Sequence, residues 1–128
     1  MDKKEFIDKW IRSFAPDITK SQFRKRIHNQ YIWHAFSWNI IPKGTYLEGD
    51  EARNAFNNAD KDGAICLQLW FDEFTTPLTE DLDSADKIET PDGYYAEFYV
   101  VGKDFSWTYI ITHETEMGLG PYFMKIKQ

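Results

Sequence analysis

The sequence is almost without cysteine, which excludes a fold held together by disulfides. Cys66 is the only cysteine among 128 residues, so no intramolecular disulfide can form. A chain with so little cysteine fits a reducing compartment. Cys66 lies in the apolar run AICLQLW, where a buried and unreactive thiol is favoured over a nucleophile.

Long apolar stretches are also missing. No run approaches the ~18 apolar residues that a membrane-spanning helix needs. The stretch MDKKEFIDKWIRSF is charged throughout and lacks the apolar centre of a secretory signal peptide. We therefore expect a cytoplasmic protein that has no contact with a membrane.

Histidine is scarce, and its spacing matches no known metal site. No pair among His28, His34 and His113 shows the tight spacing of HxH or HExxH ligands. The segment NADKDG begins like a calcium loop, but Leu69 stands where the loop needs an acid to complete its oxygen ligands. The sequence predicts neither a metal nor another cofactor.

Motifs for an activated serine or a bound phosphate are absent as well. Ser37 lacks the GxSxG turn that would expose a nucleophile. The glycines of MGLGPYF are followed by proline and a β-like run, whereas a phosphate loop needs a helix there. Each enzyme signal in the chain is therefore weak.

Aromatic residues, in contrast, are abundant. They make up 17% of the sequence, with 5 Trp, 7 Tyr and 10 Phe. A chain of 128 residues fits a single domain, residues 1–128, in which most of these rings form the core. A surplus of rings on the surface would indicate a recognition face.

Charge is distributed unevenly along the chain. Residues 1–43 carry nine Lys/Arg and four Asp/Glu, and residues 44–128 carry six and seventeen. Segment 72–92 holds eight acids and one lysine, including Asp81, Asp83 and Asp86. Such a surface attracts basic partners and repels nucleic acid. The alternative is a solvated loop or short helix whose charge only maintains solubility.

A basic cluster, Lys20 with residues 24–26, could contact phosphate. It has no glycine loops, interleaved surface aromatics or overall basic balance to support it, and nucleic-acid binding depends strongly on charge. We therefore expect no nucleic-acid partner.

Three segments are predicted to be helical. Asp2 and Glu5 have the spacing of a capping box, the apolar residues between Phe6 and Phe14 form one stripe, and Pro16 ends the helix. Thr19 and Gln22 form a capping box for a second helix. DEARNAFNNA (50–59) predicts a short middle helix.

The rest of the chain is rich in β-like segments. The predicted strands are YIWHAFSW (31–38), GAICLQLWF (63–71), YYAEFYVV (94–101), SWTYIITHE (106–114) and YFMKIK (122–127). The third and fourth strands, joined by GKDF, predict a hairpin. The fold class is therefore α+β, with two N-terminal helices and a short middle helix on a mixed, largely antiparallel sheet of about five strands.

The stretch THETEMGLGPYF (112–123) suggests a site at first sight. Adjacent strand residues point to opposite faces, so His113 and Glu114 do not easily share one ligand sphere. His113 is expected on the face of Tyr109, where a histidine in a structural hydrogen-bond network is favoured over catalysis or metal binding. A pocket of His34, His113, Glu114 and Tyr109 is kept as the enzymatic alternative.

The motifs YIWHAFSW, WTYIITHE (107–114) and GPYF (120–123), with Gly49 and Ala52 spaced as Gly-x-x-Ala, resemble a family of short bacterial proteins from Gram-positive spore-formers. The resemblance covers most of the chain from Tyr31 onward. It implies a small cytoplasmic α+β protein of unknown function, and it supplies no catalytic residues.

Two functions from different classes follow. The leading hypothesis is a non-enzymatic module that binds a basic protein partner, as immunity proteins that neutralise toxins do, through Asp81, Asp83, Asp86, Trp33 and Tyr122. The alternative is a small hydrolase or ligand-binding protein that uses the His34, His113 and Glu114 pocket. The chain is expected to be a monomer, or a homodimer joined through a strand such as YFMKIK.

Overall fold

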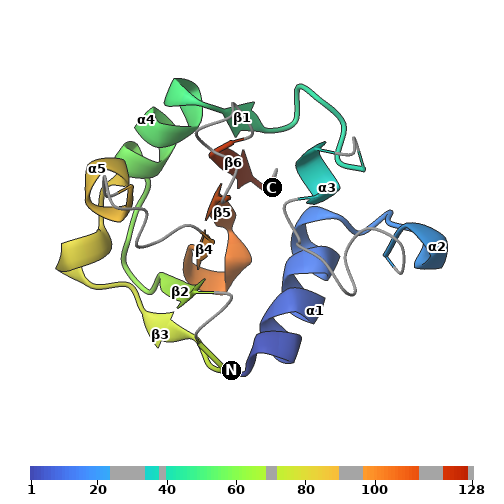
Figure 1. Ribbon diagram of the computed structural model, residues 1–128, viewed down its shortest axis with the longest axis horizontal. Helices are drawn as coiled ribbons and strands as arrows, with labels where there is room; N and C mark the ends of the chain where they lie inside the picture. Colours follow the sequence, from blue (N-terminus) through green and yellow to red (C-terminus); the bar gives the residue numbers. More distant parts are fainter. Residues whose placement is uncertain (24–33, 38–39, 69–71, 90–96, 113–119, 127–128) are drawn as a thin grey trace.

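The structure, a computed structural model, describes residues 1–23, 34–37, 40–68, 72–89, 97–112 and 120–126. Helical segments and strands alternate along this part of the chain (Figure 1). In chain order they are α1 (Lys3–Phe14), α2 (Lys20–Gln22), α3 (His34–Ser37), β1 (Leu47–Glu48), α4 (Asp50–Asn58), β2 (Ile65–Gln68), β3 (Thr76–Pro77), η2 (Glu80–Leu82), α5 (Ala85–Ile88), β4 (Phe98–Val101), η3 (Lys103–Phe105), β5 (Trp107–Ile111) and β6 (Tyr122–Lys125).

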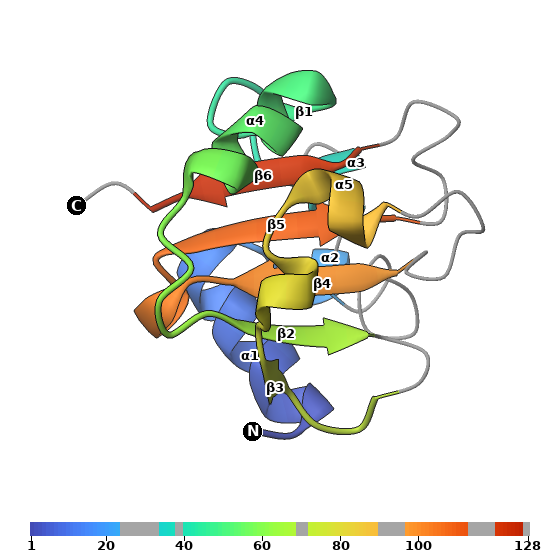
Figure 2. The same cartoon turned by 90° about the vertical axis from the view of Figure 1, so that its left-hand side faces the viewer.

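The strands form one sheet with the order β1-β6-β5-β4-β2-β3. Each strand pair in the described part of the chain is antiparallel, so the predicted α+β class is confirmed and the sheet is antiparallel rather than mixed. Figure 2 shows the sheet face-on. Tyr122 and Phe123 of β6 pair with β1 on one side and β5 on the other, so this part of β6 presents no free edge.

Helices cover both faces of the sheet. In Figure 1, α1 and α3 lie on one side of the strands, and α4 and α5 lie on the other. Because side chains alternate along a strand, the two faces bury different residues. On the α1 side these include Leu67, Tyr99, Val101, Ile110 and Tyr122. On the α4 side they include Cys66, Phe98, Val100, Trp107, Tyr109, Ile111 and Phe123.

The first helix matches its prediction. The Asp2 carboxylate accepts a hydrogen bond from the Glu5 backbone N–H at 2.8 Å, and the helix ends at Phe14, two residues before Pro16. Phe6, Trp10 and Phe14 are buried against the sheet. Trp10 also donates from Nε1 to the Thr108 hydroxyl at 2.9 Å, and Thr108 donates to the Val100 carbonyl oxygen at 3.0 Å.

The second helix begins as predicted. Thr19 and Gln22 form a complete capping box, in which each side chain accepts from the other residue's backbone N–H at 3.0 and 2.9 Å. The predicted continuation beyond Phe23 lies outside the described residues.

The predicted hairpin between the third and fourth β-like segments is confirmed as β4 and β5. Asp104 and Phe105 in its turn both have positive φ, at 58° and 56°. This backbone conformation is costly for a bulky residue. The Phe105 ring is nevertheless buried against Phe6, at 5.5 Å between ring centroids, and this packing holds the turn in place.

The predicted strand at residues 31–38 was wrong over its described part. His34–Ser37 form α3 instead, with Ala35 and Phe36 buried. The β-propensity of aromatic residues reflects packing on a half-buried surface rather than an intrinsic backbone preference. Here one helical turn satisfies that packing, because it lays Phe36 flat on Tyr122 with ring centroids 4.8 Å apart.

Two short edge strands, β1 and β3, were not predicted. Each has two residues, too few for an alternating pattern to appear in the sequence. Cys66 is buried as expected, with its sulfur 3.5 Å from the Thr76 hydroxyl, and burial raises the pKa of the thiol. None of the helices in the described ranges combines the length and apolarity that a membrane crossing requires.

Candidate functional site

The layer formed by α4, η2 and α5 is strongly acidic. We call residues 50–62 and 80–89 the acidic face; they carry nine Asp/Glu and three Lys/Arg. The segment 80–89 lies beside α4 in Figures 1 and 2, so acids that are distant in sequence gather on one side of the sheet. The described N-terminal segment 1–23, which supplies α1 on the opposite side, is nearly balanced, with five Lys/Arg and four Asp/Glu.

The three predicted binding acids lie on this face. Asp81 and Asp86 are exposed, and Asp83 is partly exposed. Asp83 accepts a hydrogen bond from the Lys87 ammonium at 2.8 Å, and this bond lowers the pKa of the Asp83 carboxyl. Asp81 and Asp86 therefore offer the more accessible negative charge, whereas Asp83 is engaged with its own lysine.

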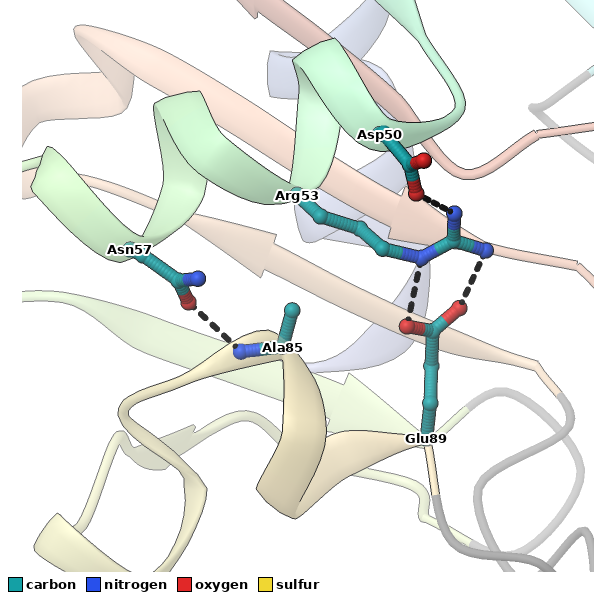
Figure 3. A network of polar contacts seen from close by, with 5 residues as sticks. All are labelled: Asp50, Arg53, Asn57, Ala85 and Glu89. Carbon is teal, nitrogen blue, oxygen red and sulfur yellow. Dashed lines mark hydrogen bonds and ion pairs between the residues drawn. The ribbon is translucent and has the colours of Figure 1, made fainter.

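An arginine joins α4 to the end of α5 (Figure 3). Arg53 donates from Nε and one terminal nitrogen to the two carboxylate oxygens of Glu89, at 2.8 and 3.0 Å. Its other terminal nitrogen donates to Asp50 at 2.7 Å. The hydrogen bonds to Glu89 raise the pKa of Arg53, so the guanidinium stays charged. This bidentate geometry is the strongest form of an arginine–carboxylate pair.

A second polar contact attaches the start of α5 to α4. The Asn57 side-chain oxygen accepts a hydrogen bond from the Ala85 backbone N–H at 2.8 Å, as Figure 3 shows. Ser84, which precedes the helix, makes no capping bond with its own side chain. Asn57 therefore caps α5 from the neighbouring helix.

Tyr109 lies beneath this pair of helices. Its ring stacks on Phe56 of α4, with centroids 4.2 Å apart and planes 5° from parallel. The residue is 0% exposed, and its hydroxyl finds no hydrogen-bond partner among the residues that the structure describes. Burial raises the pKa of the phenol, and the negative charge of Glu89 raises it further. Such a buried hydroxyl costs free energy unless something hydrogen-bonds to it.

Two of the elements that carry the predicted enzymatic pocket, α3 and β5, can be placed relative to the sheet. Tyr109 faces α4, whereas α3, which begins at His34, packs through Phe36 on Tyr122 on the opposite face. Tyr122 is 1% exposed and belongs to the core rather than to the surface. The remaining predicted site residues, Trp33, His113 and Glu114, lie outside the described residues.

Sequence reasoning missed a buried carboxyl group, that of Glu97. Glu97 is 2% exposed, and the Tyr99 hydroxyl donates to it at 3.5 Å, a long hydrogen bond. A buried acid is uncommon unless it is paired. The signal in the sequence was one acid inside the apolar run YYAEFYVV.

Glu97 belongs to a patch at one end of the sheet. Phe98 and Ile111 form the last pair of the β4–β5 ladder. Glu97 and Thr112 are the next residues outward on the two segments, so they lie next to each other. A Cβ atom placed on Gly120 would lie 3.6 Å from Thr112 and 3.2 Å from the Tyr122 ring. We call Glu97, Tyr99, Thr112, Gly120 and Tyr122 the sheet-end patch.

No group of three His, Cys, Asp or Glu residues within the described ranges is placed to hold a metal ion. A groove of about 1040 Å³ lies between α1 and α2 and is lined by Asp8, Arg12, Lys20 and apolar side chains. Among its described lining residues, Lys20 belongs to the basic cluster of the sequence, and none is a predicted binding or catalytic residue.

Comparison with known proteins gives a family but no function. Neither a curated protein nor a solved structure matches the chain. The sequence profile of a domain of unknown function, DUF4275, matches residues 4–123, which is nearly the whole chain. The protein therefore belongs to the DUF4275 family.

Proposed function

We propose that the protein is a non-enzymatic binding module whose acidic face engages a basic protein partner. The observation that carries this proposal is the concentration of nine acids and three bases in one layer of the fold. The negative electrostatic potential of such a surface accelerates the encounter with a positively charged partner and disfavours negatively charged ones. An immunity-type protein that neutralises a basic toxin would need both effects.

An exposed aromatic side chain lies in segment 72–92, where the chain runs beside the N-terminal residues that precede α1. Phe74 is 63% exposed and follows the exposed acid Glu73. Affinity in protein interfaces comes mainly from a few desolvated side chains, with aromatic residues prominent among them. Phe74 is therefore a better apolar contact for a partner than the buried Tyr122.

Two double variants with equal net charge test the proposal. Asp81→Lys with Asp86→Lys reverses exposed acids on the acidic face, and Asp8→Lys with Asp17→Lys reverses exposed acids in the N-terminal segment 1–23. Binding of a labelled basic peptide is measured by fluorescence anisotropy at several salt concentrations. We expect the first variant to lose about tenfold or more in affinity and the second to lose little. Equal losses, or no binding by the wild type, would contradict the proposal.

The sheet-end patch favours a second candidate, a ligand-binding or hydrolytic site. Thr112 immediately precedes His113, and α3 begins with His34 while its Phe36 packs on Tyr122. Phe36 and Thr112 thus both lie close to the end of the sheet at which Glu97 is buried. In this second proposal, His34, His113 and Glu114 supply the acid–base groups.

Alanine variants separate this candidate from a purely structural role. His34→Ala and His113→Ala are compared with the matched control His28→Ala for turnover of activated ester and phosphodiester substrates, and for thermal stability. A hydrolase would lose turnover in the first two variants at nearly unchanged melting temperature. Lower melting temperatures without any turnover in the wild type would exclude the hydrolase.

A further inference from the structure

A pocket of about 470 Å³ lies where the end of α4 meets the start of β5 and the end of β6. In Figure 2 these ends lie together at the left-hand end of the sheet. Pockets that bind small molecules typically enclose about 300–1,000 Å³. We propose that this pocket binds a small zwitterion of the amino-acid class, which carries an ammonium and a carboxylate beside an aliphatic body. This activity is separate from the binding of a basic partner and does not depend on it.

The floor of the pocket is apolar and firmly held. Trp107 and Phe123 contribute stacked rings whose centroids are 5.7 Å apart, and Ala55 and Ala59 contribute methyl groups one turn apart on α4. The two rings are 5% and 7% exposed, so the apolar surface that they offer is small. A Cβ atom on Gly102 would lie 2.2 Å from the Trp107 Nε1 atom, so a larger residue there would push the ring away. A floor of this size suits an aliphatic side chain better than a large aromatic one.

Two lysines lie on one side of the pocket. Lys103 belongs to η3, and Lys125 is the register partner of Trp107, so its side chain is on the same face of the sheet. No hydrogen bond or ion pair joins either ammonium group to another described residue. The partly exposed Ser106 lies between them in the lining and has a hydroxyl that can donate. These groups match the carboxylate of a ligand.

The turn that carries Lys103 and Ser106 is fixed from the opposite side of the sheet. Between them lie Asp104 and Phe105, both with positive φ, at 58° and 56°. Such conformations persist only where the surrounding structure holds them. Here the Phe105 ring packs on Phe6, with centroids 5.5 Å apart. The rim of the pocket is therefore largely preorganised, which lowers the entropic cost of binding a ligand.

Two acids lie on the other side, in the turn that follows α4. Asp60 accepts a hydrogen bond from the Asp62 backbone N–H at 2.9 Å, which shapes the turn. Lys61, between them, directs its ammonium to two backbone carbonyl oxygens near the end of α4, at 3.0 and 3.3 Å. The Asp62 carboxylate forms no ion pair within the described part of the chain. Both carboxylates can therefore receive the ammonium of a ligand.

The acids and the lysines of the pocket are neighbours. A Cβ atom placed on Gly63, the residue after Asp62, would lie 3.2 Å from the Lys103 Cβ atom. The stem of Lys103 thus packs against the acidic turn, although no ion pair joins it to Asp62. A ligand with a single charge would meet a like charge in this pocket, whereas a zwitterion can be oriented to meet opposite charges at both ends.

Three ligands that differ only in charge test this assignment. Binding of leucine, N-acetylleucine and leucine amide to the full chain is measured by isothermal titration calorimetry. N-acetylleucine lacks the ammonium, and leucine amide lacks the carboxylate. We expect leucine to bind, and each derivative to bind about tenfold more weakly or worse, because one end of the ligand then lacks its charged partner.

Two double variants show which side chains read each charge. Lys103→Gln with Lys125→Gln should weaken leucine binding about tenfold and remove its advantage over leucine amide. Asp60→Asn with Asp62→Asn keeps a side-chain acceptor in the turn and should remove the advantage over N-acetylleucine. The matched control, Lys4→Gln with Lys43→Gln, changes exposed lysines outside the pocket and should leave all three affinities unchanged. All six positions are exposed, so thermal melting should show folded variants.

Each other outcome overturns the inference. Absence of leucine binding removes the ligand class. Equal binding of leucine and its two derivatives would mean that apolar contact alone holds them. A loss in the control variant as large as in Lys103→Gln with Lys125→Gln would mean that leucine binds outside this pocket. The binding of a basic peptide is measured separately, so the proposed function and this pocket can fail independently.

Discussion

The two faces of the sheet are covered by helices that are attached in different ways. On one face, α1 buries Phe6, Trp10 and Phe14, and its principal side-chain hydrogen bond to the sheet is the one that Trp10 donates to Thr108. On the other face, α5 has four residues and is joined to α4 by an arginine–carboxylate pair and a side-chain cap.

Both layers bury apolar residues, but within the described residues only the layer of α4 and α5 adds an arginine–carboxylate pair near the surface. Apolar burial is strong and not directional, so the α1 layer secures the fold without presenting chemistry to solvent. Polar pairs near the surface can be exchanged for equivalent pairs with a partner at a modest free-energy cost. Variants on the two sides of the sheet should therefore behave differently.

The largest effect is expected in the α1 layer. Trp10→Ala should lower the free energy of unfolding by about 3–5 kcal/mol, because it leaves a cavity and removes the indole donor to the Thr108 hydroxyl. Urea denaturation measures the change. Trp10→Phe loses the hydrogen bond but only part of the buried ring, so it should cost clearly less. Equal losses in the two variants would mean that the hydrogen bond, and not apolar burial, attaches α1.

Thr108 and Tyr109 are adjacent residues of β5 that face opposite sides of the sheet, so variants of the two compare the two faces directly. Thr108 faces α1 with its hydroxyl bonded on both sides, to the Trp10 indole and to the Val100 carbonyl oxygen. Thr108→Val keeps the shape but leaves the buried indole N–H without its acceptor. We expect a loss of about 1–3 kcal/mol in the free energy of unfolding. A loss near zero would show that the indole finds another acceptor.

Tyr109, the next residue, should respond in the opposite direction. Tyr109→Phe removes a buried hydroxyl that has no partner among the described residues, while the stacking on Phe56 stays. Its free energy of unfolding should be unchanged or higher by about 1 kcal/mol. A clear loss of stability would reveal a hydrogen bond that holds this phenol in the free protein, and the hydroxyl would then be structural.

Much of the fold was predicted from the sequence, and the elements that were missed have physical reasons. The start of α1, the Thr19–Gln22 capping box and the β4–β5 hairpin were predicted because local signals determine them. The helix at 34–37 was missed because burial of Phe36 against Tyr122, which is distant in sequence, outweighs the β-propensity of its aromatic neighbours.

The site was only partly predictable for a similar reason. Segment 72–92 identified the acids of α5 and η2, since charge density is visible in one stretch of sequence. The Arg53–Glu89 pair spans 36 residues, and nothing local links the two. The opposite orientation of Tyr109 and Tyr122 follows from strand alternation together with the register of β5 and β6, which the sequence alone does not provide.

The smallest expected effect concerns the exposed Asp83–Lys87 pair. The hydrogen bond from Lys87 lowers the pKa of Asp83 in the folded protein, so the pair stabilises the fold above the ordinary Asp pKa of about 3.9. This contribution is lost as pH falls through the lowered pKa. Asp83→Asn should therefore reduce the melting temperature slightly at pH 7 and not at all in strong acid.

The matched comparison is Glu89→Gln, which removes a partly buried carboxylate from the bidentate pair on the same face. Its decrease in melting temperature at pH 7 should be several times that of Asp83→Asn, because an exposed pair is screened by water and salt. Added salt should shrink the effect of Asp83→Asn more than that of Glu89→Gln. Equal effects with equal salt dependence would mean that Glu89 is no better shielded from solvent than Asp83, and the bidentate pair would then hold α5 to α4 no more strongly than an exposed pair does.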